Sequence, residues 1–450
     1  MTAPVVAEAL HEAADDPTTW TDHPAAEAFV SALLAGVTRS SPGLASLAAR
    51  LATETATDLI DWLDHVVAPV DEAALTDLGW RLDDATGLWR HPAARLPSMA
   101  VGRTISVGLG VDDVDLAAAA FGSATAVAGP SGGALRTVTL GADGGIALVA
   151  VERRSFAAGV APTGGPAADP AWQQAVELWR TRPLGADPAG GDDPDAALAG
   201  ALDRARATVD DLGRDLASAA FLHVERERWE RRNAAARTTR RAHDGVGLGW
   251  ANRDHHTFRS SRVHFAALLA LLDVLGFERR EQFHAGADAG WGAQVLEHPG
   301  TGEVVFADVD LSAAELGTDL TRPLLPAPLG PVGTWCAVHG DSVLAAGMHH
   351  LAVRCRFDDY PAVHPGIGLQ PPFSELDDLR QRFTAPEPWP VDTARIRSLL
   401  DHGDLADGAA ERLTSGTVPG SHLELIERRF GFKGFNQTSV SRTITDNDLR

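Results

Sequence analysis

The chain has 450 residues, which at about 150 residues per domain predicts two or three folded units. Hydrophobic residues make up 44% of the chain and charged residues 22%, as in ordinary globular proteins, so global disorder is excluded. The 39 basic and 61 acidic residues leave a formal charge of −22, and this field opposes nonspecific binding to nucleic acid or anionic lipid.

We expect a protein that is not exported. Its two cysteines, Cys336 and Cys355, are not spaced as CxxC and cannot build a disulfide framework or a thiolate zinc site. The N-terminus lacks a basic segment followed by an apolar run, and no stretch reaches the roughly 18 apolar residues of a membrane span. We therefore expect a cytoplasmic protein with no membrane or nucleic-acid partner, and the oligomeric state stays open.

The first part of the chain has helical periodicity. Between Pro24 and Leu82, apolar residues recur three and four positions apart, as in Leu59, Trp62 and Val66. We therefore predict amphipathic helices here and assign residues 1–95 to a helical N-terminal region.

The pattern then changes to short β-like runs separated by Gly-rich turns. The runs are Thr104–Leu109, Leu135–Leu140 and Ile146–Glu152, with one helical candidate at Val114–Ala120. This order predicts a divergent, metal-free βαβββ-like module over residues 96–160. Residues 161–250 follow as a linker, rich in Pro, Gly and Asp around Gly185–Pro194, and a long helical pattern over 195–241.

Residues 251–450 contain the elements of two further modules. The first has a strand at Asp254–Ser260, a helix at His264–Leu275 and strands at Phe277–His284, Trp291–Glu297 and Val304–Leu311. The second has a strand at His349–Phe357, helices near Ser374–Phe383 and Asp392–Leu400, and a strand at His422–Arg428. We predict an α+β fold in which paired βαβββ units curl into a cup-shaped sheet beside the helical N-terminal region.

Histidines are concentrated in this last region. Twelve of the 17 lie between His243 and His422, and four of them form the adjacent pairs His255–His256 and His349–His350. Side chains alternate across a strand, so one member of each pair can face a cavity. Arg259 and Arg354 each follow a histidine by four residues, a spacing that returns to the same face of a strand.

A carboxylate late in the same region completes a possible metal site. Glu424 lies in the strand-like segment VPGSHLELIERR. Two neutral imidazoles and one carboxylate leave positions free for substrate and oxygen, as in non-haem Fe(II) oxygenases. The spacing alone has no local signature of the HExxH kind, so a structural role for any one histidine remains the alternative.

Three segments, in order along the chain, resemble one family. They are Asp254–Arg259 (DHHTFR) with the following LLDVLGFERREQF, His349–Arg354 (HHLAVR), and Val418–Glu424 (VPGSHLE). Together they are similar to the motifs of the 2-oxoadipate dioxygenase/decarboxylase family, which is built on vicinal-oxygen-chelate modules. The resemblance covers roughly the last 200 residues, and it extends to Gly434–Thr438 (GFNQT), which is similar to a segment lining the family's cavity.

The resemblance implies a site and a reaction. The Fe(II) ligands would be His255, His350 and Glu424, and the substrate would be a 2-oxo acid that is decarboxylated and hydroxylated with O2. Arg259 would hold a substrate carboxylate, a task suited to a planar bidentate donor. We assign catalytic roles to Arg259 and Gln437, and substrate contacts to Arg259, Arg354 and Asn436.

Two other functions compete with this interpretation. The same ligands could serve an oxygen-independent vicinal-oxygen-chelate isomerase, lyase or epimerase that uses Zn2+, Mn2+ or Co2+. The cup could also be a binding site for a small carboxylate without a metal, in a protein that is not an enzyme. Activity without oxygen would identify the first, and metal analysis the second.

Overall fold

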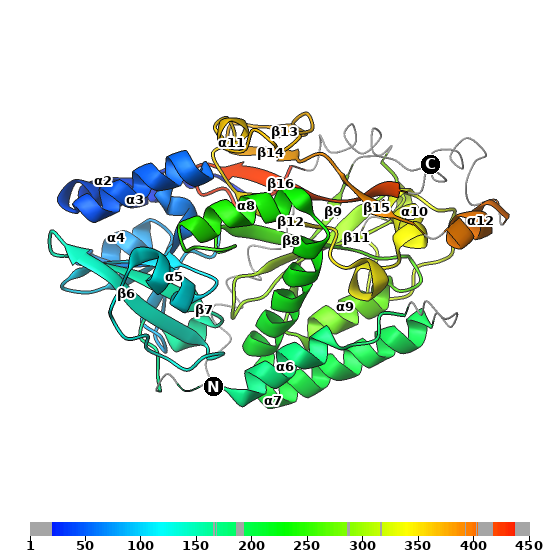
Figure 1. The fold of residues 1–450 in the computed structure, drawn as a ribbon, viewed down its shortest axis with the longest axis horizontal. Coiled ribbons are helices and arrows are strands. Elements are labelled where there is room, and N and C mark those ends of the chain that lie inside the picture. Colours follow the sequence, from blue (N-terminus) through cyan, green and yellow to red (C-terminus); the bar gives the residue numbers. More distant parts are fainter. Residues whose placement is uncertain are drawn as a thin grey trace.

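Two β-sheets joined by helices make up the chain. The computed structural model describes residues 20–164, 167, 169–185, 193–285, 289–315, 317–391, 393–401, 403 and 417–436. Within these residues a seven-stranded sheet is followed by a nine-stranded sheet. Figure 1 shows the N-terminal sheet at one end of the molecule and the long helix α7 along the other part.

The N-terminal sheet consists of two related units. The first is β1 (Leu63–Ala68), α4 (Glu72–Asp77), β2 (Arg81–Asp83), β3 (Leu88–Arg90) and β4 (Ser98–Val101). The second is β5 (Ile105–Gly110), α5 (Val114–Phe121), β6 (Leu135–Asp143) and β7 (Ile146–Arg153). The strand order is β2-β3-β4-β1-β5-β7-β6, so the two units join where β1 pairs antiparallel with β5.

The structure corrects the predicted helical region. Helices α2 (Pro24–Ser40) and α3 (Pro42–Arg50) form as expected, but Leu59–Trp62 is a 3₁₀ turn, η2, that leads into strand β1. β1 lies between β4 and β5, and it is a short, largely apolar run in which four of the six residues are buried. A short apolar run of this kind cannot be told from a helix by periodicity. The predicted boundary after residue 95 falls inside this sheet, and the other domain boundaries stay predictions.

The C-terminal sheet repeats the same plan on a larger scale. Its first unit is β8 (Arg253–Arg259), α9 (Phe265–Val274), β9 (Glu278–His284), β10 (Gly292–Glu297) and β11 (Val304–Val309). Its second unit is β12 (His350–Arg354), α11 (Tyr360–Val363), β13 (Ser374–Glu375), β14 (Leu379–Phe383), β15 (Glu387–Pro390), α12 (Thr393–Asp401) and β16 (Thr417–Arg428). In each unit the first and last strands are parallel neighbours, and β8 pairs antiparallel with β12. The predicted α+β fold with paired βαβββ units and an added helical N-terminal region is confirmed.

One predicted helix of this region was wrong. The segment Ser374–Phe383 forms strands β13 and β14, and β14 pairs antiparallel with β16 over Leu379–Phe383. Its charged sequence, SELDDLRQRF, also fits a solvated helix, but Leu379 and Gln381 are buried while Arg380 and Arg382 are not. Pairing with a long neighbouring strand therefore outweighs local propensity.

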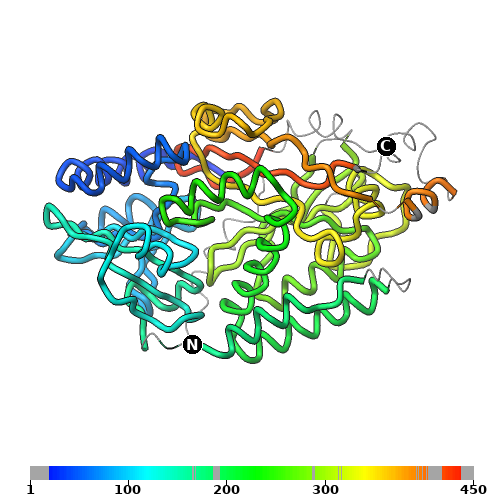
Figure 2. Tube along the Cα trace, viewed as in Figure 1, coloured from blue at the N-terminus to red at the C-terminus, as the bar shows by residue number. Residues whose placement is uncertain are grey.

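The helices between the sheets cover the larger one. They are α6 (Pro170–Arg180), α7 (Pro194–Arg231) and α8 (Ala234–Gly245), with α10 (Pro331–His339) and the short turns η1 (Leu51–Thr55), η3 (Phe156–Ala158), η4 (Ala313–Glu315) and η5 (Ser342–Ala346) elsewhere. Helix α7 packs on α6 and α9, and Figure 2 shows the three running side by side. Gly213 adopts φ 74°, which breaks the regular α-helix. Among the described residues, no helix combines the length and apolarity needed to cross a bilayer.

A ring contact anchors α7 to the sheet that carries the site. Phe221 of α7 stacks on Phe258 of β8 at 5.7 Å between centroids, and both rings are fully buried. We expect Phe258→Ala to lower the free energy of unfolding by about 3–5 kcal/mol, because it leaves a cavity beneath the helix. Chemical denaturation measures the change. Val263→Ala is the control, since Val263 is 72% exposed; equal stability of the two variants would contradict the assignment.

Candidate metal centre

Strand pairing brings three predicted ligands to one face of the C-terminal sheet. β12 lies between β8 and β16. Ala352 of β12 is in register with His255 on one side and with Glu424 on the other. His350 lies two residues from Ala352, so its side chain points to the same face. The methyl group of Ala352 leaves the space between the three longer side chains free.

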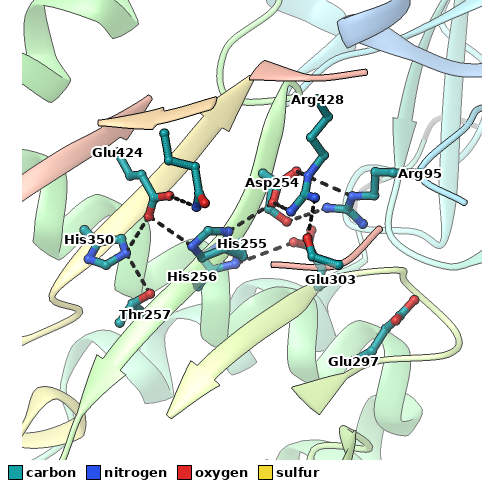
Figure 3. A network of polar contacts seen from close by, with 12 residues as sticks. Arg95, Asp254, His255, His256, Thr257, Glu297, Glu303, His350, Glu424 and Arg428 are labelled. Carbon is teal, nitrogen blue, oxygen red and sulfur yellow. Dashed lines mark hydrogen bonds and ion pairs between the residues drawn. The ribbon is translucent and has the colours of Figure 1, made fainter. Parts of the chain in front are cut away.

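The three ligand atoms converge. The Nε2 atoms of His255 and His350 lie 3.2 Å and 3.0 Å from the same oxygen, Oε2 of Glu424 (Figure 3). One donor atom from each residue lies within 4.8 Å of the others, and all three side chains are buried. Two imidazole nitrogens and one carboxylate oxygen suit a divalent transition metal. The residues therefore fit the ion that the sequence predicted.

Further polar groups orient the ligands. Gln381 donates from Nε2 to Oε1 of Glu424 at 2.7 Å, and Asp254 places Oδ1 3.0 Å from Nδ1 of His255. A β-bulge in β8 next to His255 gives Asp254 its position, and Arg428 holds its carboxylate with two contacts of 2.7 and 2.9 Å. Contacts of this kind set the tautomer and direction of a ligating histidine.

The electrostatics keep the carboxylate ionised. Burial raises the pKa of Glu424, but His255 and His350 outweigh burial and hold this pKa well below its usual range. Burial lowers the pKa of His350, and Glu424 offsets only part of that effect. Burial also opposes protonation of His255, yet Glu424 and Asp254 together raise its pKa. Since ligands bind metals in their deprotonated form, an ion would displace the proton that His255 takes up.

A second group of histidines adjoins the first. His349, His350 and His422 also offer donor atoms within 4.8 Å of one another. Nδ1 of His349 lies 2.9 Å from Nδ1 of His350, and Nε2 of His422 is buried without a hydrogen-bond partner. Burial lowers the pKa of His349 and of His422 well below the usual value, so both rings are neutral. The adjacent pair in the sequence indicated His349, but nothing singled out His422 as a third member.

The cavity beside the three ligands is small and mostly aromatic. Its volume is about 50 Å³. Its aromatic walls are Phe283, Trp291, Phe306, Phe373, Phe383 and Phe435. The polar lining beyond the ligands consists of Thr257, Asp308, Gln381 and Asn436. Asn436 donates from Nδ2 to Oγ of Ser374 at 3.0 Å, so the predicted substrate contact is at the cavity wall.

The two predicted arginines lie at opposite ends of this face. Arg259 continues the row of His255 and Thr257; its side chain is 16% exposed and its Nε is 3.9 Å from Asp308. Arg354 instead donates to the backbone oxygen of Asp61 at 2.5 Å and lines a different cavity. β8 and β12 are antiparallel, so a step of four residues, about 13 Å, runs in opposite directions on the two strands. Arg354 is therefore not part of this site, and Gln437 lies outside the described residues.

Two polar residues of the cavity escaped the sequence analysis. Gln381 was hidden by the wrong helix prediction. Asp308 of β11 pairs in register with Arg259, and burial raises its pKa to about 7, with Glu424 adding to burial and Arg259 opposing it. A single carboxylate inside the apolar strand VVFADV was the available signal, because an unpaired acid is costly in such a strand.

Comparison with known proteins adds only distant likenesses. No family model and no curated protein sequence matches the chain. A 4-hydroxymandelate synthase mutant from Streptomyces coelicolor is 12% identical, with 87% of this chain and 98% of that one covered and a TM-score of 0.26. Methylmalonyl-CoA epimerase from Mycobacterium tuberculosis is 15% identical, covering 39% of this chain and 87% of that one, with a TM-score of 0.23. At identities and TM-scores this low, the activities of those proteins do not transfer to this chain.

The ligands can be tested by metal loading. We expect Glu424→Gln and His255→Ala each to lose stoichiometric divalent metal while the far-UV circular dichroism stays unchanged, because two donors do not replace three. Elemental analysis after metal loading and desalting measures the bound ion. His223→Ala is the control, since His223 lies on α7 with its side chain 42% exposed. Full metal content in both site variants would rule out this triad.

The role of Gln381 gives a separate expectation. Gln381→Ala removes the hydrogen bond that fixes Glu424, so we expect metal affinity to fall about 10–100-fold with the fold retained. Titration with Co2+, followed by its visible absorbance, measures the affinity. Gln282→Ala is the matched control, because Gln282 bonds to the backbone of Gly317 and Thr318, away from the three ligands. An unchanged affinity in Gln381→Ala would mean that Glu424 is held by other contacts.

Proposed function

We propose that the chain is a non-haem Fe(II) enzyme that oxidatively decarboxylates and hydroxylates a 2-oxo acid. The observation that carries the proposal is the meeting of His255, His350 and Glu424 on three adjacent strands. An Fe(II) ion held by these residues would supply Lewis acidity and electrons for oxygen chemistry, with coordination positions left for substrate and O2. The other residues of the cavity would bind and orient the substrate together with Arg259, which lies beside the lining residue Asp308.

Arg259 is the proposed anchor for the substrate carboxylate. Its Nε atom is buried and has no hydrogen-bond partner, and its guanidinium lies 5.4 Å from the ring centroid of Trp335. A guanidinium with a free edge binds a carboxylate through two parallel hydrogen bonds. Asp308 beside it has a pKa raised to about 7 by burial, so it can hold a proton near neutral pH and leave the positive charge of Arg259 for the substrate.

The walls of the cavity favour a substrate with an apolar side chain. Six of the thirteen lining residues are aromatic, and Phe306 and Phe435 pack directly against His255 at 4.7 and 5.3 Å between ring centroids. A second carboxylate, as in 2-oxoadipate, would meet these rings without a cationic partner. The same rings exclude bulk water from the ligands.

The overall reaction is balanced by one molecule of oxygen. A 2-oxo acid and O2 yield CO2 and a hydroxy acid one carbon shorter. One oxygen atom enters the new carboxylate and the other becomes the hydroxyl group. Both two-electron oxidations, the decarboxylation and the hydroxylation, are thus accounted for by the four-electron reduction of O2.

The reaction can be tested with protein loaded with Fe(II) under anaerobic conditions. 2-Oxo acids with aliphatic, aromatic and carboxylate side chains are supplied, oxygen is admitted, and O2 uptake and CO2 release are recorded together. We expect equimolar O2 uptake and CO2 release, fastest with apolar side chains, and none with Glu424→Gln. Product formation before oxygen is admitted would favour the isomerase or lyase alternative. No turnover across the panel by iron-loaded protein would refute the proposal.

The role proposed for Arg259 can be tested separately. Arg259→Gln removes charge-assisted hydrogen bonds worth about 1.5–3 kcal/mol, so KM for the 2-oxo acid should rise by roughly tenfold or more. Steady-state oxygen uptake measures KM and kcat separately. Arg103→Gln serves as control, since Arg103 is exposed. An unchanged KM would assign the substrate carboxylate to another residue.

A further inference from the structure

A second cavity lies between the two sheets. Its volume is about 210 Å³. Both sheets contribute to its walls: the N-terminal sheet through Arg90 of β3 and Arg153 of β7, and the C-terminal sheet through Arg253 of β8 and Arg354 of β12. It shares no lining residue with the cavity at the metal centre. The two sites are therefore separate, and their chemistry differs, because the second cavity is charged where the first is aromatic.

Positive charge exceeds negative charge in this wall. The cationic side chains are Arg90, Arg95, Arg153, Arg253, Arg354 and Lys433, against the carboxylates Asp64, Glu297 and Glu303. Each carboxylate already has a cation: Asp64 lies 2.7 Å from Arg153, Glu297 lies 2.9 Å from Lys433, and Glu303 lies 2.6 Å from Arg253. Three guanidinium groups remain without a carboxylate of their own in the wall.

These three arginines bond mainly to backbone oxygens. Arg90 donates to Pro299 at 3.0 Å, Arg95 to Gly302 at 3.3 Å, and Arg354 to Asp61 at 2.5 Å. Nε of Arg354 is buried without a hydrogen-bond partner. Nε of Arg95 is 3.7 Å from Asp254, but Arg428 already pairs with that carboxylate. Each guanidinium can donate up to five hydrogen bonds, so much of this capacity is left for a ligand.

The cations also destabilise one another. Burial lowers the pKa of Arg354, and repulsion from Arg95 adds to that effect while Asp61 offsets part of it. Burial lowers the pKa of Lys433 to about 8, with Arg280 and Arg95 acting in the same direction against Glu297. Partly desolvated like charges at close range are costly without a counter-ion.

We propose that this cavity is a binding site for a small, multiply charged oxoanion, a phosphate or a polycarboxylate. The three guanidinium groups that lack a carboxylate partner in the wall supply planar, bidentate donors, the geometry that phosphate and carboxylate oxygens accept. The volume is below the roughly 300–1,000 Å³ of pockets for drug-sized ligands, which favours a compact ion over a nucleotide or a lipid. The proposal does not rest on the proposed iron chemistry.

Arg95 and Asp254 connect the cavity to the metal centre. Arg95 lines the cavity and contacts both the backbone oxygen and the carboxylate of Asp254, whose Oδ1 lies 3.0 Å from Nδ1 of the ligand His255 (Figure 3). A ligand that draws Arg95 toward the cavity thus acts on the group that orients His255.

Calorimetry and thermal unfolding of the full chain, freed of metal, test the site. Inorganic phosphate and citrate are titrated separately, with sodium chloride adjusted to constant ionic strength. We expect saturable binding of at least one anion and a rise in the unfolding temperature. Binding of phosphate alone would identify a phosphate site, and binding of citrate alone a carboxylate site. No saturable binding of either anion would overturn the proposal.

Substitutions of cavity arginines test where the anion binds. Arg90→Gln and Arg354→Gln should each weaken the anion by roughly tenfold or more, because each removes hydrogen bonds to a charged group. Arg39→Gln, on the exposed side of α2, is the control and should bind as the original chain does. Glu424→Gln should also bind normally, which separates this site from the metal centre. Equal binding in all four variants would place the anion elsewhere.

Discussion

The position of β12 between β8 and β16 is the constraint on which the site depends. Parallel pairing on one side and antiparallel pairing on the other place His255, Ala352 and Glu424 in one row across the sheet. A larger residue than alanine in the middle of that row would fill the space on which the three ligand atoms converge. Because side chains alternate along a strand, a register slip of one residue on either side would send a ligand to the opposite face.

Charge compensation extends outward from this row in layers. Glu424 is surrounded by imidazoles, His255 by two carboxylates, and Asp254 by Arg428 and Arg95. Each buried charge is thus stabilised by the next, which is the condition under which ionised groups persist away from water. The layers end at the charged cavity between the sheets, where Arg90 and Arg354 donate to backbone oxygens and have no carboxylate partner in the wall. The aromatic and the charged cavity are therefore two ends of one polar network.

Sequence reasoning found the parts of this arrangement that rest on local pattern. The strands of the first sheet from β5 onward, the strand and helix at β8 and α9, and the adjacent histidines all followed from periodicity and order. Sequence reasoning failed where pairing with a neighbouring strand decides the local structure. β1 is a strand because it pairs with β4 and β5 on its two sides, and β14 is a strand because β16 pairs with it. Arg354 was assigned to the wrong site because residue spacing does not show that β8 and β12 run antiparallel. Gln381 was missed because the segment that forms β14 was predicted to be a helix. Asp308 could be identified as a cavity residue only once its pairing with Arg259 on the neighbouring strand was known.

The order of the strands along the chain sets when the centre can exist. His255 and Glu424 are 169 residues apart, and β16 is the last strand of the sheet to leave the ribosome. A nascent chain that has completed β8 and β12 contains His255 and His350 but lacks Glu424, the third residue of the site. An ion held by all three residues could therefore bind only after β16 is synthesised, and translation products that end before β16 lack the complete site.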